Sequence, residues 1–159
     1  MNIILSPIAW VRSSETAQRE DYWGGIVSDI VLDAGRFTPE ALTGLSDFSH
    51  VEVLFHLHGV QATSVVTGQR HPRGNQDWPE VGIFAQRAKA RPNRIAASVC
   101  RILSIRDLTI SVQGLDAFDG SPVLDIKPVM KEFLPERAAV RQPSWASTLM
   151  SHYFELEKT

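Results

Sequence analysis

Basic side chains gather in one stretch of a chain that is slightly acidic as a whole. Four cations fall within eight residues, at Arg87, Lys89, Arg91 and Arg94. The stretch lies between two apolar segments, 81–85 and 95–103, so we expect it to be held at the end of a sheet. Such a cluster suits a phosphate or a carboxylate, although a solvated charged loop is the commoner role of any one such run.

A second polar segment, 67–78, contains further basic groups at Arg70, His71 and Arg73. Its glycines, prolines and polar residues predict an exposed loop. The loop is either a plain surface connection or a substrate-facing segment, because loops of this length usually have a function. If the two basic segments meet in space, they form one larger positive patch.

The composition predicts one soluble globular domain. The chain has 159 residues, 43% of them hydrophobic, with 16 Lys and Arg against 18 Asp and Glu and a net charge of -2. This charge excludes a generally basic nucleic-acid coat but permits a local basic patch. No apolar run reaches the roughly 20 residues that cross a bilayer, and the start lacks the features of a secretion signal. The single cysteine, Cys100, excludes an internal disulfide and favours a cytosolic location.

Alternation of apolar and polar residues with a period of two is the main structural signal. It predicts strands over 1–10, 26–32, 51–57, 81–85, 108–112 and 123–129. Short strands separated by turns favour an antiparallel sheet that closes into a sandwich or a barrel. The pattern of segment 95–103 fits a helix face and a strand face equally well. The fold class is therefore predicted to be mainly β.

Helix signals are few. Thr38, Pro39 and Glu40 resemble a helix start, with Pro at the first helical position. Segment 144–157 follows Pro143 and resembles a C-terminal helix, in which Trp145 and Tyr153 pack the helix. We expect a barrel domain over 1–135 and a helical extension over 136–159 that packs on it.

Four side chains of one strand share a face and raise the question of a metal site. These are His50, Glu52, His56 and His58. A β-barrel with inward histidines invites a metal, but the spacing differs from the His-x-His and later Glu of cupin-type enzymes. We therefore predict no metal, with His58 as a ligand contact or a hydrogen-bonded structural histidine.

Three sequence blocks occur in a specific order, at 82–87, 91–96 and 114–128, and Phe48-Ser49-His50 precedes them. Together they resemble the TsaA-like, TrmO-type methyltransferase family, over about residues 7–129. The sequence departs from the family at Arg94, where proline is usual, and at Ala96, where glycine is usual.

The resemblance implies a small antiparallel β-barrel that binds S-adenosylmethionine, unlike the doubly wound Rossmann methyltransferases. It implies methylation of the N(6) nitrogen of threonylcarbamoyl-adenosine next to the tRNA anticodon, a homodimer, and a strand at 95–103. Two alternatives stay open: the same cofactor with a small-molecule substrate, or a non-catalytic barrel that binds a nucleotide-like ligand.

The family's cofactor contacts map onto ten positions of this sequence: Gly24, Gly25, His58, Gly59, Arg87, Ala97, Leu115, Asp116, Ala117 and Phe118. Arg87 is expected to pair with the methionine carboxylate. Asp116 is expected to bind either the ribose hydroxyls or the methionine amino group.

Phosphate contacts with RNA are expected from the basic segments, at Arg70, Arg73, Lys89, Arg91, Asn93 and Arg94. Trp78 is the candidate for base stacking. Asp125 and Lys127, two apart on one strand face, are candidate catalytic residues with Asp125 as the base, although a structural ion pair explains them equally well.

Overall fold

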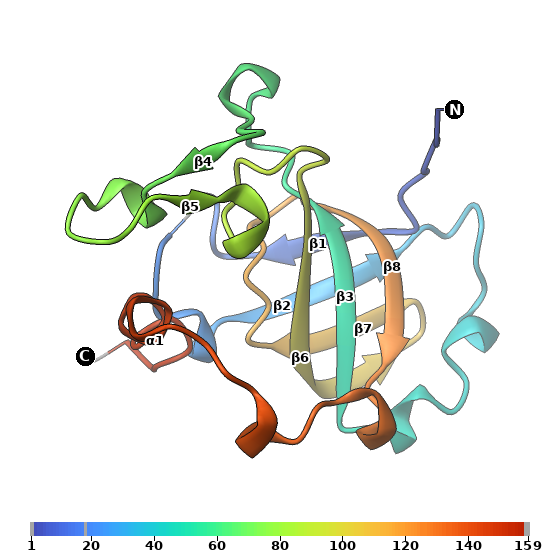
Figure 1. Ribbon diagram of the computed structural model, residues 1–159. Coiled ribbons are helices and arrows are strands. Elements are labelled where there is room, and N and C mark those ends of the chain that lie inside the picture. The colour runs from blue at the N-terminus through green and yellow to red at the C-terminus, as the bar shows by residue number, and fades with distance from the viewer. Residues whose placement is uncertain (1, 18, 158–159) are drawn as a thin grey trace.

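Six antiparallel strands close into a barrel in the computed structural model, which describes residues 2–17 and 19–157 (Figure 1). The strands are β1 (Ala9–Ser13), β2 (Val27–Leu32), β3 (His50–His56), β6 (Ile95–Arg106), β7 (Thr109–Gln113) and β8 (Pro122–Pro128). Their order around the barrel is β1-β2-β7-β6-β3-β8, and β1 closes it by pairing with β8. The predicted fold class, an antiparallel barrel that is mainly β, is confirmed.

The barrel interior is filled by alternate residues of each strand. In β3, Val51, Val53 and Phe55 are buried while the residues between them are half-buried. Segment 95–103, which the pattern left undecided, lies in β6 and pairs with both β3 and β7. Burial among these core residues raises the pKa of the Cys100 thiol to about 12, so this cysteine stays a neutral core group.

A small two-stranded sheet stands apart from the barrel and comprises β4 (Gln69–Arg70) and β5 (Val81–Gly82). The strand predicted over 81–85 thus ends at Gly82 and continues as the 3-10 turn η6 (Ile83–Ala85). The reason is the buried Gln86, whose Nε2 donates to the carbonyls of Arg70 and Val81 and so turns the chain. The loop predicted over 67–78 is therefore paired at β4 and turns at η5 (Pro72–Gly74).

The remaining short elements are single 3-10 turns: η1 (Trp23–Gly25), η2 (Pro39–Leu42), η3 (Leu45–Asp47), η4 (Ala62–Ser64), η7 (Lys131–Phe133) and η8 (Arg137–Ala139). The helix expected after Thr38 is η2, and the Thr38 side chain caps no backbone group there. The first strand begins at Ala9 rather than near residue 1; Met1 lies outside the described residues.

The chain leaves the barrel after β8, passes along its outside, and ends beside η1 (Figure 1). The helix predicted over 144–157 is only α1 (Ser144–Leu149). Beyond it, the carbonyls of His152 and Tyr153 accept hydrogen bonds from the backbone N–H groups of Tyr22 and Trp23, at 3.0 and 2.8 Å. These carbonyls fix the path of the chain by a contact with a distant segment instead of by helical bonds.

Residues 158–159 of the expected extension are outside the described part of the chain. None of the helices that the structure describes combines the length and the apolar character needed to span a membrane.

Candidate functional site

A cavity of about 800 Å³ opens where the end of β6, the η6 turn, the connection between β7 and β8, and the C-terminal segment meet. Five of the ten expected cofactor residues line it: Arg87, Ala97, Asp116, Ala117 and Phe118. Four of the six expected RNA contacts also line it: Arg70, Arg73, Lys89 and Arg91. The fold thus brings the basic segments and the Asp116 segment, which are separate in the sequence, to one hollow.

Both carboxylate oxygens of Asp116 accept hydrogen bonds at the wall of this cavity. Its neighbours Leu115 and Ala117 are buried in the barrel, which leaves the Asp116 side chain on the cavity side. One carboxylate oxygen, Oδ1, accepts a hydrogen bond from the hydroxyl of Ser98, and the other, Oδ2, accepts one from the Tyr153 hydroxyl at 2.6 Å. Burial, together with the nearby charge of Asp116, raises the pKa of Tyr153, so that this hydroxyl stays protonated and donates.

Arg87 is anchored to β6, the strand that also holds Asp116. Its Nη2 donates to the carbonyl oxygen of Ala97 at 2.6 Å, and Ala97 immediately precedes the Ser98 that bonds Asp116. A cation and an anion are therefore anchored to consecutive residues of β6 and line one cavity. This arrangement suits a ligand that carries polar groups of both kinds.

The cavity is strongly positive although the chain is acidic. Seven basic side chains line it, Arg19, Arg70, Arg73, Arg87, Lys89, Arg91 and Arg141, against two acidic ones, Glu20 and Asp116. The structure pairs two of these cations. The Asp21 carboxylate binds Arg73 at 2.8 Å and raises the pKa of Arg73, while Glu157 binds Arg19 at 2.8 Å.

Three lining cations are available to an external anion. In residues 2–17 and 19–157, no carboxylate lies within ion-pair distance of Arg70, Lys89 or Arg141. Arg91 differs from these three, because its Nη1 donates to the carbonyl of Gln86 at 3.0 Å and so supports the turn after η6.

Five expected cofactor residues do not line the cavity. Leu115 is fully buried in the barrel core. His58 and Gly59 contact Phe118: the His58 and Phe118 rings lie 4.7 Å apart, and a Cβ on Gly59 would come within 2.7 Å of the Phe118 ring. Gly24 and Gly25 lie beneath the C-terminal segment. These glycines and His58 therefore pack behind Phe118 and the C-terminal segment, which line the cavity.

Gly24 makes the closest of these contacts. A Cβ at this position would overlap the backbone carbonyl of Phe154, whereas at Gly25 it would meet only the flexible end of the Leu156 side chain, at 3.2 Å. We expect Gly24→Ala to lower the free energy of unfolding by about 1–3 kcal/mol, measured by urea titration, because backbone must shift. Gly25→Ala is the matched control, with an expected change of at most about 0.5 kcal/mol. Equal stability of the two variants would contradict the close docking of the C-terminal segment.

The Arg94 and Asn93 side chains do not line the cavity either. Arg94 has a φ of 51°, and its Nη1 donates to the carbonyl of Val60 at 2.7 Å. The ring of proline fixes φ near −65°, so the proline usual in the family could not take this backbone conformation. Arg94 therefore has a local structural partner, and the structure does not place it with the free cations.

Asp125 and Lys127 lie on β8 and form an ion pair with each other. Both side chains are largely exposed, 45% and 57%, and neither lines the cavity. They pair across the sheet with Leu54 and Glu52 of β3. The structure does not bring this expected catalytic pair to the other site residues.

Several lining residues were not assigned to the site by sequence. Trp145, Leu149, Met150 and Tyr153 come from the C-terminal segment, where the two aromatic residues were interpreted as helix packing. Phe84 lines the cavity and is 79% exposed beside the buried Ile83. Trp78, the expected stacking residue, is half-buried and does not line the cavity. Phe84 could have been predicted as a site residue because it is a large aromatic residue within a turn.

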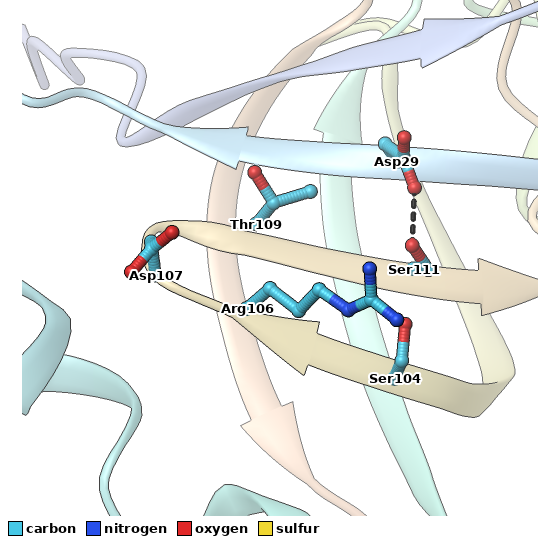
Figure 2. A pocket seen from close by; sticks show the side chains of 6 residues that line it. All are labelled: Asp29, Ser104, Arg106, Asp107, Thr109 and Ser111. Carbon is cyan, nitrogen blue, oxygen red and sulfur yellow. Dashed lines mark hydrogen bonds between the residues drawn. The ribbon is translucent and has the colours of Figure 1, made fainter.

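A second, polar pocket of about 450 Å³ lies on β2, β6 and β7 (Figure 2). Asp29 points toward Ser111 on the adjacent strand and accepts its hydrogen bond, and Arg106 extends along the pocket toward Ser104. None of the expected site residues line it. No group of three metal-ligating side chains is placed together in the described ranges. The larger cavity is therefore the candidate site.

Comparison with known proteins assigns the chain to a family. Residues 10–133 match the family model described as the tRNA-methyltransferase O N-terminal domain. A Methanothermobacter thermautotrophicus protein named a probable S-adenosyl-L-methionine-binding protein is 39% identical over 134 residues, which is 83% of this chain and 93% of that protein. An Archaeoglobus fulgidus S-adenosyl-L-methionine-binding protein is 33% identical and covers 88% of this chain and 96% of that protein.

Other relatives match over part of their length. The human tRNA (adenine(37)-N6)-methyltransferase is 36% identical over 93 residues, 58% of this chain and 21% of that protein. The match with a Pyrococcus abyssi relative spans about half of that protein, 48%, and 59% of this chain. The crystal structure of TrmO from Pseudomonas aeruginosa superposes with a TM-score of 0.72 at 29% identity, covering 91% of this chain and 62% of that one.

Proposed function

Because this chain belongs to the family of the tRNA-methyltransferase O N-terminal domain, we propose that it is an S-adenosylmethionine-dependent methyltransferase. We place the cofactor in the cavity lined by Arg87 and Asp116. The observation that carries this proposal is the anchoring of these two opposite charges to adjacent residues of β6. Two relatives that match over nearly their whole length are named for binding the same cofactor.

The chemistry asked of the protein is mainly alignment and exclusion of water. S-adenosylmethionine would supply an activated methyl group: the methyl carbon would form a bond with the acceptor nitrogen as its bond to sulfur breaks, with S-adenosylhomocysteine as the leaving group and the nitrogen proton passing to a base or to water. The apolar side chains of Phe55, Leu57 and Leu149 line part of the cavity and would reduce the contact of a bound ligand with water. Asp125 and Lys127 stay predicted catalytic residues. The carboxylates that line the cavity itself are Glu20, which pairs with Arg73, and Asp116.

The proposed acceptor is the N(6) nitrogen of threonylcarbamoyl-adenosine next to a tRNA anticodon. The positive cavity favours a polyanion, and the free cations Arg70, Lys89 and Arg141 suit phosphate contacts. An anticodon-loop base is single-stranded and can turn into a pocket at little unpairing cost. The human and mouse relatives are named for methylating adenine 37 of tRNA.

Phe84 is the proposed stacking surface for the acceptor base. Its ring is 79% exposed and lines a cavity rimmed by basic side chains, which is the combination that single-stranded nucleic acids bind. Phe84→Ala is expected to lower the catalytic efficiency of methyl transfer to tRNA about tenfold, measured under conditions of saturating cofactor. Phe133→Ala is the control, because Phe133 is 83% exposed and lies outside the cavity lining. Equal activities of the two variants would contradict stacking at Phe84.

Two measurements in sequence test the proposed function. Calorimetry with S-adenosylmethionine first establishes whether the cofactor binds. The protein is then incubated with cofactor and tRNA that carries threonylcarbamoyl-adenosine, and the nucleosides are analysed by mass spectrometry for a gain of one methyl group. Binding with transfer to tRNA supports the proposal. Binding with transfer only to small molecules, or with no transfer to any acceptor, would favour one of the two alternatives, and absence of binding would contradict the proposal.

The homodimer implied by the family resemblance stays part of the proposal, as does the cytosolic location. Exposed apolar side chains lie together near the N-terminus, at Ile3, Ile4 and Leu5. A second copy of the chain would cover them. Light scattering after gel filtration measures the mass of the assembly.

A further inference from the structure

We propose that Arg87 and Asp116 form a clamp for the α-amino-acid group of the cofactor, and that Tyr153 is the positioning residue that holds Asp116 in it. Tyr153 belongs to the C-terminal segment, so this segment completes the cofactor site. The inference rests on the proposed function, because it concerns how the same cavity recognises S-adenosylmethionine. It names the group of the cofactor that the two charges recognise, and it adds a residue that the sequence assigned to packing.

Arg87 and Asp116 are tied to neighbouring residues of β6 and line the same cavity. Arg87 donates to the carbonyl of Ala97, and Asp116 accepts from the hydroxyl of Ser98. The carboxylate and the ammonium of an α-amino acid are carried on one carbon atom. A guanidinium and a carboxylate that line one cavity can bind both groups at once.

The partners of the two side chains leave their charges unbalanced. Asp116 accepts hydrogen bonds from two neutral hydroxyls, and within the described residues no basic side chain forms an ion pair with it. Each carboxylate oxygen can accept a second bond. The polar partner of Arg87 is a backbone carbonyl. An ammonium balances the charge of Asp116, which a neutral ribose diol does not, so the geometry favours the amino-acid end of the cofactor.

Tyr153 reaches Asp116 only through the docking of the C-terminal segment. The carbonyl of Tyr153 accepts from the N–H of Trp23, Gly24 lies directly against Phe154, and Glu157 binds Arg19. Together with the hydrogen bond from the Tyr22 N–H to the His152 carbonyl, these contacts hold the segment on both sides of Tyr153. The Tyr153 hydroxyl then occupies Oδ2 of Asp116 and restricts rotation of the carboxylate, which pre-organises the anionic half of the clamp.

The test compares two ligands that differ in the amino-acid group. S-adenosylmethionine carries it, and 5′-methylthioadenosine lacks it while keeping the adenosine. We expect Tyr153→Phe to weaken binding of S-adenosylmethionine about tenfold in calorimetry, and binding of 5′-methylthioadenosine by less than about twofold. Tyr22→Phe is the matched control, because no hydrogen bond of the Tyr22 hydroxyl occurs among the described residues and Tyr22 does not line the cavity. Its affinity for both ligands should equal that of the wild type.

A double-mutant cycle with Asp116→Asn separates positioning from a general loss of packing. If Tyr153 acts through Asp116, then Tyr153→Phe should have a much smaller effect when Asp116→Asn is already present. Unchanged affinity of Tyr153→Phe for S-adenosylmethionine would overturn the role of Tyr153. Equal losses for both ligands would overturn the clamp, because Asp116 would then serve the ribose. A wild-type protein that binds neither ligand would contradict the proposed function itself, before any variant is compared.

Discussion

Replacement of Asp116 by alanine should weaken the binding of S-adenosylmethionine by about 100-fold, the largest effect that we expect from a single substitution. The variant removes the carboxylate that lines the cavity together with Arg87, and it leaves the hydroxyls of Ser98 and Tyr153 without their acceptor. Both losses act on the same site. The ammonium of the ligand loses its anionic partner, and the Ser98 and Tyr153 side chains lose the hydrogen bonds that hold them. Calorimetry measures the affinity, and methyl transfer at a fixed low cofactor concentration should fall in parallel.

Asp29 offers a matched control for this substitution. Like Asp116, it accepts a hydrogen bond from a serine on a neighbouring strand, here Ser111, but it lines the second pocket (Figure 2). Asp29→Ala therefore makes the same chemical change outside the candidate site, and its cofactor affinity should be that of the wild type. If Asp116→Ala kept wild-type affinity, the cofactor site would have to lie outside the cavity described here.

Reversal of three cavity cations should produce the largest loss of RNA binding. The variant combines Arg70→Glu, Lys89→Glu and Arg141→Glu, whose side chains have no carboxylate partner among the described residues. We expect the affinity for tRNA at low salt to fall by at least about 100-fold, and the slope of log affinity against log salt to flatten by about two. Filter binding over a salt series measures both quantities. Arg91 and Arg94 are left unchanged because each donates to a backbone carbonyl.

The control reverses three cations outside the cavity lining: Arg101, Arg106 and Lys131. It changes the net charge of the protein by the same amount, so it measures the general electrostatic effect. The cavity variant should lose much more affinity than the control. Equal losses would show that tRNA responds to net charge and would remove the basic rim from the RNA site. S-adenosylmethionine affinity should stay near that of the wild type in both variants.

Local patterns in the sequence were enough to predict an antiparallel sheet that closes into a sandwich or a barrel, and the family resemblance favoured the barrel. Alternation with a period of two reflects the geometry of a strand, in which neighbouring side chains face opposite sides, so the core residues of β3 and β7 could be identified without knowledge of their partners. Segment 95–103 was the exception, because small residues such as Ala96 and Ala97 suit either periodicity. Its assignment as a strand came from the family resemblance.

Arg87 and Asp116 were predicted as site residues from the family resemblance of the segments at 82–87, 91–96 and 114–128. A motif allows this because it specifies both the residue types and their order. The sequence also predicted Asp125, Lys127 and Arg94 as site residues, but none of the three lines the cavity. Asp125 and Lys127 form an ion pair with each other on β8, and the Arg94 side chain donates to the carbonyl of Val60. The direction of a side chain at a bulge or turn depends on the neighbouring segments, which a motif does not describe.

The amino-acid sequence by itself determined most strands of the sheet, the basic segment and the Asp116 segment, because each is encoded in residues that are close together along the chain. Only the tertiary structure decided that the C-terminal segment becomes a wall of the cavity. The hydrogen bond from Tyr153 to Asp116 joins residues 37 positions apart, and it depends on backbone bonds from Tyr22 and Trp23 that are much farther away in the chain. Contacts of this kind follow from packing in three dimensions and leave no periodic signal in the sequence.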